Sequence, residues 1–246
     1  MRSARVVGVL AALALAGCSA LPGGDEPTSP PATSSGSEST TDEGPVTGAG
    51  RPLDEAELHR VLPSPADLGP DWAHDPAKTI FETETSDISP SACAPLLLKG
   101  PERDKVLSSQ RARVQDNYVR GESTVGHGSF MGIWAYSTDE AMPSRLFDDA
   151  GSLIGTCSSM EVTQADTGSV STYRSSQLPF PNMGDRTLAL RTKISQSLRT
   201  VTMDYVVIKV GHNTVFVVNG DYLEEPDTSA TERAARAALK NLREST

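Results

Sequence analysis

Alternating apolar and polar positions dominate the C-terminal half of the chain. They predict strands over 161–162, 170–178, 186–194, 200–210 and 213–222, with a tight hairpin turn at Gly211-His212-Asn213-Thr214. Within 186–194, one face is apolar and the other is basic: Leu188, Leu190, Thr192 and Ile194 against Arg191 and Lys193. Consecutive strands joined by short turns predict an antiparallel sheet with one covered face and one solvated face.

Helix-like segments with capping signals surround these strands. Asp54-x-x-Glu57 begins a short helix that Pro63 and Pro65 end, and 91–98 has the spacing of a second helix. Ser137-x-x-Glu140 predicts a helix running to about residue 154, and Ser229-x-x-Glu232 begins an alanine-rich final helix. Together with weaker strands at 78–85 and 109–119, this order predicts an α+β domain, with a central antiparallel sheet and helices packed mainly on one face.

The segment 124–136 predicts a strand with an unusual face. Gly126, Gly128 and Gly132 share that face with Trp134 and Tyr136. Because glycines leave room for a close approach next to aromatic area, these five residues are the candidate ligand cleft. The alternative is that a packed helix or a neighbouring aromatic side chain fills the same space.

The N-terminus has the pattern of an export signal. Arg2 and Arg5 precede an apolar run over 6–16, which as a helix would be about 17 Å long and too short to span a bilayer core of about 30 Å. The run ends at Leu15-Ala16-Gly17-Cys18, which resembles the lipobox of bacterial lipoproteins. That resemblance implies a signal peptide at 1–17 and acyl chains, such as palmitate, on Cys18 that hold the protein on the outer face of the cytoplasmic membrane. An ordinary secretory signal cleaved near Ala20 is the alternative.

The stretch 18–50 predicts a disordered linker between this anchor and a domain over 51–246. It is rich in Ser, Thr, Gly, Pro and acidic residues, and Leu21 and Val46 are its only large apolar residues. Such a segment cannot bury enough apolar surface to offset its conformational entropy. Its Ser, Thr and Pro content equally suits an O-glycosylated stalk.

Charge and cysteine content narrow the class of protein. Residues 51–246 contain 27 Asp and Glu against 20 Lys and Arg, with no basic cluster, so we expect no nucleic-acid partner. With Cys18 lipidated, Cys93 and Cys157 remain, and an even pair in an exported domain predicts one disulfide. A free thiol or a metal pair is the alternative. No histidine lies at ligand spacing from either cysteine, and we expect no metal and no cofactor.

Catalytic motifs are missing from the sequence. Gly126-His127-Gly128-Ser129 is the nearest match to a nucleophile elbow, and its strand context does not suit one. We therefore expect no catalytic residues and a binding module for an unidentified small molecule or envelope component. The alternatives are an envelope hydrolase that assembles Ser and His by folding, and a lipid carrier with a large apolar cavity.

Four segments resemble the PknH-like extracellular sensor domain family. They are VLPSPADLGPDW at 61–72, SACAPLL at 91–97, GIWAYSTDEAMPSRLFDDAGSLIGTC at 132–157 and DYVVIKVGHNTVFVVNGDY at 204–222. Such domains occur on receptor Ser/Thr kinases and lipoproteins of actinobacteria. The resemblance implies an α+β fold, a cleft for an unidentified ligand and disulfide-bonded cysteines. The chain has no kinase segment, so only the recognition module is implied.

Overall fold

The computed structural model describes residues 48–75, 87–121, 128–165, 167–197 and 199–245, which belong to one compact unit spanning 43–246. Several sequence-based predictions fall outside these ranges: the signal peptide at 1–17, Cys18, most of the 18–50 linker, the strand at 78–85 and Gly126. These remain predictions.

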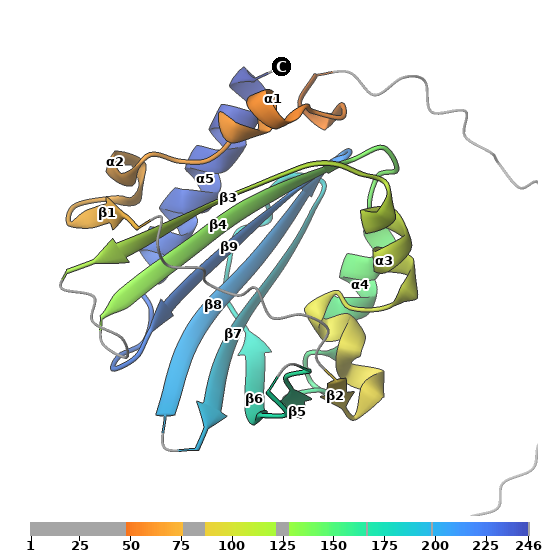
Figure 1. The fold of residues 1–246 in the computed structure, drawn as a ribbon, viewed down its shortest axis with the longest axis vertical. Coiled ribbons are helices and arrows are strands. Elements are labelled where there is room, and N and C mark those ends of the chain that lie inside the picture. The colour runs from red at the N-terminus through yellow and green to blue at the C-terminus, as the bar shows by residue number, and fades with distance from the viewer. Residues whose placement is uncertain (1–47, 76–86, 122–127, 166, 198, 246) are drawn as a thin grey trace, which may run out of the picture. The chain divides into compact units, whose positions relative to one another are not determined.

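The described residues form nine strands that pair antiparallel in a single sheet, in the order β1-β3-β4-β9-β8-β7-β6-β5-β2 (Figure 1). The strands are β1 Trp72–His74, β2 Asp87–Ser89, β3 Gln110–Arg120, β4 Ser129–Thr138, β5 Ser159–Thr163, β6 Val170–Gln177, β7 Arg186–Gln196, β8 Arg199–Val210 and β9 Asn213–Asp221. The predicted hairpin turn joins β8 to β9, where Val210 pairs with Asn213. The α+β class with a central antiparallel sheet is confirmed.

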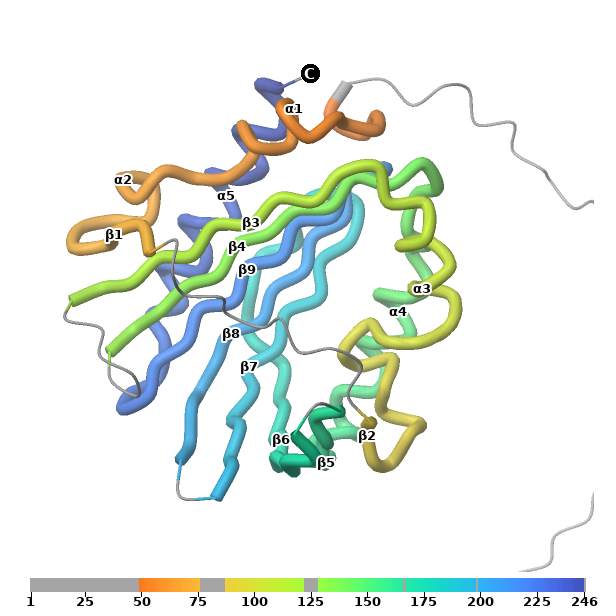
Figure 2. Tube along the Cα trace, viewed as in Figure 1, coloured from red at the N-terminus to blue at the C-terminus, as the bar shows by residue number. Residues whose placement is uncertain are grey.

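Helices cover both faces of the sheet. The first face carries α1 Glu55–His59, α2 Pro65–Leu68 and α5 Thr228–Glu244, and the second carries η2 Ser91–Leu97, α3 Pro101–Ser108 and α4 Ser144–Leu153. Each face has its own core, which we call the first core and the second core. Figure 2 shows α2 beside α5, far from α3 and α4. The prediction of helices mainly on one face is corrected.

The central strands explain why two cores form. β4 and β9 are buried at every position, so their two faces each present apolar side chains. Ile133 lies in the first core and Trp134 in the second, and Val206 and Val207 divide in the same way. Amphipathic alternation is therefore lost in the middle of the sheet. The solvated face that the sequence predicted is seen in the described residues beyond this centre, for example on β7, where Lys193 is exposed.

The predicted capping box at Ser137-x-x-Glu140 is wrong. β4 continues to Thr138, because Ser137 pairs with Asn213 of β9 and its hydroxyl accepts a hydrogen bond from the Leu53 backbone N–H at 2.7 Å. The helix α4 begins only at Ser144, directly after Pro143. A residue pattern that suits a cap thus serves strand pairing here.

The last helix follows its prediction closely. α5 begins at Thr228, one residue before the predicted Ser229, and Asp227 caps it by accepting a hydrogen bond from the Ser229 backbone N–H. The predicted apolar stripe is buried in the first core: Ala234, Ala235, Ala238, Leu239 and Leu242. This stripe is what holds the helix on the sheet.

The chain enters the domain at the turn between β8 and β9. Asn213 Nδ2 donates to the carbonyl oxygens of Ala49 at 3.0 Å and Arg51 at 2.8 Å, and the His212 N–H donates to Gly50 O at 2.9 Å. Gly211 has a φ of 56°, and a Cβ there would collide with the Gly50 backbone. Residues 49–51, the docked segment, are therefore held by a turn that only glycine suits.

Acid should destabilise the fold through Glu57, near the start of the domain. Two hydrogen bonds from Arg51, together with one from the Asp54 backbone N–H, lower the pKa of Glu57 from 4.5 to about 2. A carboxylate with a depressed folded-state pKa stabilises the fold fully above its unfolded pKa and loses that contribution as the pH falls through the folded pKa. We expect the fold to lose stability between about pH 4.5 and about pH 2.

Urea titrations at several pH values test this expectation with two glutamines on one helix. Glu57→Gln should flatten the loss of stability over that interval, whereas Glu55→Gln should keep the wild-type pH profile, since the Glu55 side chain is 75% exposed. Identical profiles for wild type and Glu57→Gln would contradict the assignment.

Candidate functional site

A cavity of about 190 Å³ opens on the second face of the sheet. Side chains from every strand between β3 and β9 line it, and the end of η2 and the start of α3 close one side. Because the sheet provides most of the lining, residues separated widely in the sequence meet here. The volume lies below the roughly 300 Å³ at which drug-sized sites begin, which suits a small ligand.

Aromatic rings form the floor of this cavity. Trp134 stacks on Phe216 with 5.4 Å between ring centroids and an interplanar angle of 9°, and Tyr136 meets the same ring edge-on at 5.3 Å. Strand register causes this packing, because Trp134 is the direct partner of Phe216 across β4 and β9. Tyr205 of β8 adds a third ring, 6.2 Å from Phe216. The floor is aromatic, with one stacked pair of rings and two rings set at an angle to it, and neighbouring strands fix its geometry.

Three cationic side chains also line the cavity: Lys99, Arg103 and Arg113. Lys99 is half-buried between η2 and α3, and burial, with the nearby charge of Arg103, lowers its pKa. The Arg113 guanidinium lies 5.5 Å from the centre of the Tyr136 ring, which is cation–π distance. No Asp or Glu is among the described residues that line the cavity. The lining is therefore positive although the whole chain carries a net charge of −10.

Three tyrosines line the same cavity: Tyr136, Tyr173 and Tyr205. Burial raises the pKa of Tyr173 and Tyr205, so both hydroxyls stay protonated at neutral pH. Within the described part of the chain, none of the three hydroxyls makes a hydrogen bond to another residue. Each is available to donate a hydrogen bond to a ligand.

The predicted cleft residues are placed differently. Trp134 and Tyr136 line the cavity. Gly132 is buried in β4, paired with Asn117 and Val218, and is not part of the lining, and Gly128 precedes β4 with a φ of 82°. The structure therefore brings together the aromatic half of the predicted set. Nothing in the sequence pointed to the three cations, Tyr173 or Tyr205, because no local spacing links residues that meet only through strand pairing.

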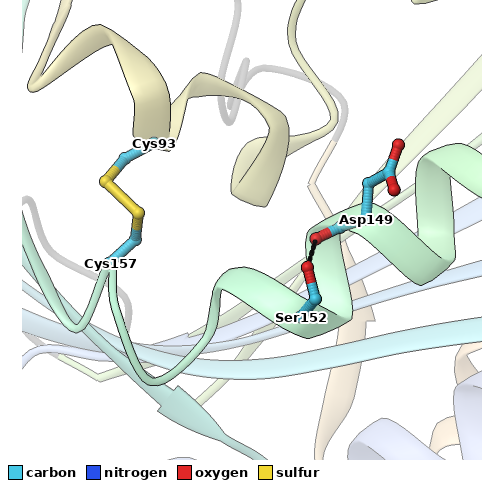
Figure 3. Close-up of a disulfide and its surroundings, with 4 residues drawn as sticks. All are labelled: Cys93, Asp149, Ser152 and Cys157. Carbon is cyan, nitrogen blue, oxygen red and sulfur yellow. Dashed lines mark hydrogen bonds between the residues drawn. A yellow bond between two sulfur atoms is a disulfide. The ribbon is translucent and has the colours of Figure 1, made fainter.

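Cys93 and Cys157 form the predicted disulfide. Both cysteines are almost completely buried in the second core, and Figure 3 shows the bond joining η2 to the turn after α4. Leu97, at the end of η2, lines the cavity. The disulfide therefore fixes the position of the segment that closes one side of the site.

Histidines do not assemble a catalytic group among the described residues. His74 bonds to the Asp116 carboxylate at 2.9 Å, and His212 bonds to the Thr138 carbonyl oxygen at 2.9 Å. His59 lies on the exposed surface of α1, as predicted, and His127 lies outside the described residues. No Ser, Thr or Cys side chain in the described ranges hydrogen-bonds the imidazole ring of a histidine, and these ranges hold no cluster of three potential metal ligands.

None of the described helices combines the length and the apolar character that crossing a membrane requires.

Comparisons with known proteins give a match at the level of fold. No family model matches the sequence, and no curated protein sequence matches it. Among solved structures, the chain has the fold of a bacterial extracellular domain: that of PknH from Mycobacterium tuberculosis. The TM-score is 0.54 at 10% identity, over 80% of this chain and 98% of that chain. The PknH-like resemblance seen in the sequence is confirmed as a likeness of fold.

A second solved structure is an uncharacterized protein from Mycobacterium smegmatis, an Rv0999 ortholog. It matches with a TM-score of 0.43 at 16% identity, over 76% of this chain and 96% of that chain.

Proposed function

We propose that this protein is a non-catalytic, extracytoplasmic recognition domain that binds a small ligand in the cavity on the second face of its sheet. The observation that carries the proposal is the aromatic floor around Phe216, beside three tyrosines whose hydroxyls make no hydrogen bond within the described part of the chain. A concave, largely apolar site with a few convergent polar groups is the usual form of a ligand pocket. The likeness to the PknH extracellular domain supports the same assignment.

The arrangement of reactive groups favours binding over catalysis. The described residues pair Cys93 with Cys157 in a disulfide and place His74 beside a carboxylate with no nucleophile bonded to it. An envelope hydrolase would need an activated nucleophile next to a base. A lipid carrier would need far more space than the roughly 190 Å³ available here.

Location is the second part of the proposal. The lipobox-like sequence ending in Cys18 would anchor the chain to the outer face of the cytoplasmic membrane, and the acidic linker after it would hold the domain away from that surface. The disulfide supports an oxidising compartment outside the cytoplasm.

Native mass spectrometry of the full chain, purified from the membrane fraction of its host, tests both parts. We expect a mass that starts at Cys18 and carries acyl chains, together with a bound small molecule that dissociates on activation. The Cys18→Ala variant should leave the membrane fraction and keep the bound molecule, because the cavity does not depend on the anchor. An unmodified mature chain would contradict the anchor, and a ligand-free protein would contradict the recognition function.

A further inference from the structure

We propose that the cavity selects a small organic anion: a carboxylate or phosphate monoester carried on a flat apolar body. This inference rests on the proposed recognition function and adds the chemical class of the ligand. It follows from three features that meet in one place, namely the cations, the tyrosine hydroxyls and the stacked rings.

The positive charge at the cavity has no counter-charge in the described lining. Lys99 and Arg113 have no ion-pair partner among the described residues, and Arg103 pairs only with its neighbour Asp104 at 3.3 Å, whose side chain is 66% exposed. Placing like charges together at a partly buried site is unfavourable, and a bound anion relieves that repulsion. A neutral or cationic ligand would leave it in place.

The backbone holds Lys99 in this position. Leu98 adopts a left-handed conformation with a φ of 50°, and its side chain is buried. The N–H groups of Leu98 and Lys99 donate to the carbonyl oxygens of Pro95 and Ala94 at 2.9 and 3.1 Å, which closes the end of η2. The lysine therefore projects from a fixed helix end and not from a loose loop.

The polar groups match the oxygens of an anionic head group. Guanidinium groups offer forked donors that suit carboxylate and phosphate geometry, and a lysine ammonium adds a point charge. The protonated hydroxyls of Tyr173 and Tyr205 add neutral donors. The stacked Trp134 and Phe216 rings, with apolar side chains such as Ile194 and Val218, provide a surface for a flat apolar body.

Four probes of matched size test the charge preference: benzoate, phenyl phosphate, benzyl alcohol and benzylamine. The full chain contains two tryptophans, Trp72 and Trp134, and Trp72 lies in the first core on the opposite face. In a Trp72→Phe background, Trp134 fluorescence therefore reports on the cavity alone. We expect at least one anion to bind about tenfold more tightly than the alcohol and the amine, because a hydrogen bond to a charged group contributes about that much. The stronger anion identifies the head group as carboxylate or phosphate.

A charge reversal with a matched control completes the test. Lys99→Glu should remove most of the anion preference, because the new carboxylate pairs with the remaining arginines, so that both anions bind no more than about twofold more tightly than benzyl alcohol. Lys193→Glu makes the same change of net charge at an exposed position on the other side of β7, and should keep the anion preference. Arg113 is exposed, so its replacement should leave the fold intact. Arg113→Gln should weaken the binding of both anions, and this variant replaces Lys99→Glu in the test if Lys99→Glu does not fold.

The outcomes separate this inference from the proposed function. Equal binding of all four probes, or tighter binding of the alcohol or the amine in the unreversed protein, overturns the anion preference and leaves ligand recognition standing. Loss of preference in Lys193→Glu as well would mean that overall charge, and not the cavity, sets the selectivity, which also overturns the inference. A chain that binds no probe and also carries no ligand in native mass spectrometry overturns both.

Discussion

Replacing Arg191 with methionine is expected to lower the free energy of unfolding by about 3 kcal/mol, because it leaves a buried carboxylate without its counter-charge. The Asp204 side chain is fully buried and accepts two hydrogen bonds from the Arg191 guanidinium, at 2.7 and 3.1 Å. Thr228 and Thr231 donate to the same carboxylate. The network ties β7 and β8 to the start of α5.

Urea denaturation measures this effect against a matched control. Arg174→Met makes the same chemical change at an exposed position on the neighbouring strand β6, and should stay within about 0.5 kcal/mol of wild type. Adding Asp204→Asn to Arg191→Met should recover part of the loss, because asparagine removes the unpaired charge and keeps contact with the threonines. Equal effects of Arg191→Met and Arg174→Met would contradict the assignment.

The second large effect is expected from removing the disulfide. The double variant Cys93→Ala, Cys157→Ala should lose up to about 4 kcal/mol, the loop-entropy contribution of a bond that closes a loop over a sequence separation of 64 residues. Alanine is the suitable replacement because both cysteines are buried. Hydrogen exchange should accelerate around η2 and after α4, while β8 and β9 stay protected.

Ser152→Ala provides the control for this double variant. Ser152 lies in α4, five residues before Cys157, and donates to the Asp149 carbonyl oxygen of its own helix (Figure 3). Its replacement should leave both the unfolding midpoint and the exchange pattern near wild type. Unchanged exchange around η2 in the cysteine variant would show that packing alone holds the segment that bears Leu97 and Lys99.

The sequence predicts the buried face of a half-covered strand better than it predicts the layers packed on the sheet. β7 has a clear alternation because only one of its faces is buried, and the pattern of Leu190 against Arg191 shows which face that is. β4 and β9 are buried on both faces, so their sequences cannot indicate that a second layer of helices exists. Helix α3 buries only Val106 and has no apolar stripe, which is why it was not predicted.

The residues of the candidate site were also predicted only in part. Trp134 and Tyr136 were predicted from one strand, because a shared face follows from two-residue spacing. Lys99 and Tyr173 reach the cavity from a helix end and from β6, and only the sheet order brings them together. The disulfide was predictable since an even pair of cysteines leaves one pairing, whereas the cations gave no signal in an acidic chain.

The docked segment at residues 49–51 has a mechanical consequence. A force applied from the N-terminal side would act first on the three hydrogen bonds at the turn between β8 and β9, and next on the bond between Leu53 and Ser137. These four bonds are separate from the backbone pairing of β4, β8 and β9. The strands that carry the aromatic floor would stay paired while this short segment peels away, and a domain pulled by its leading end would keep its cavity intact.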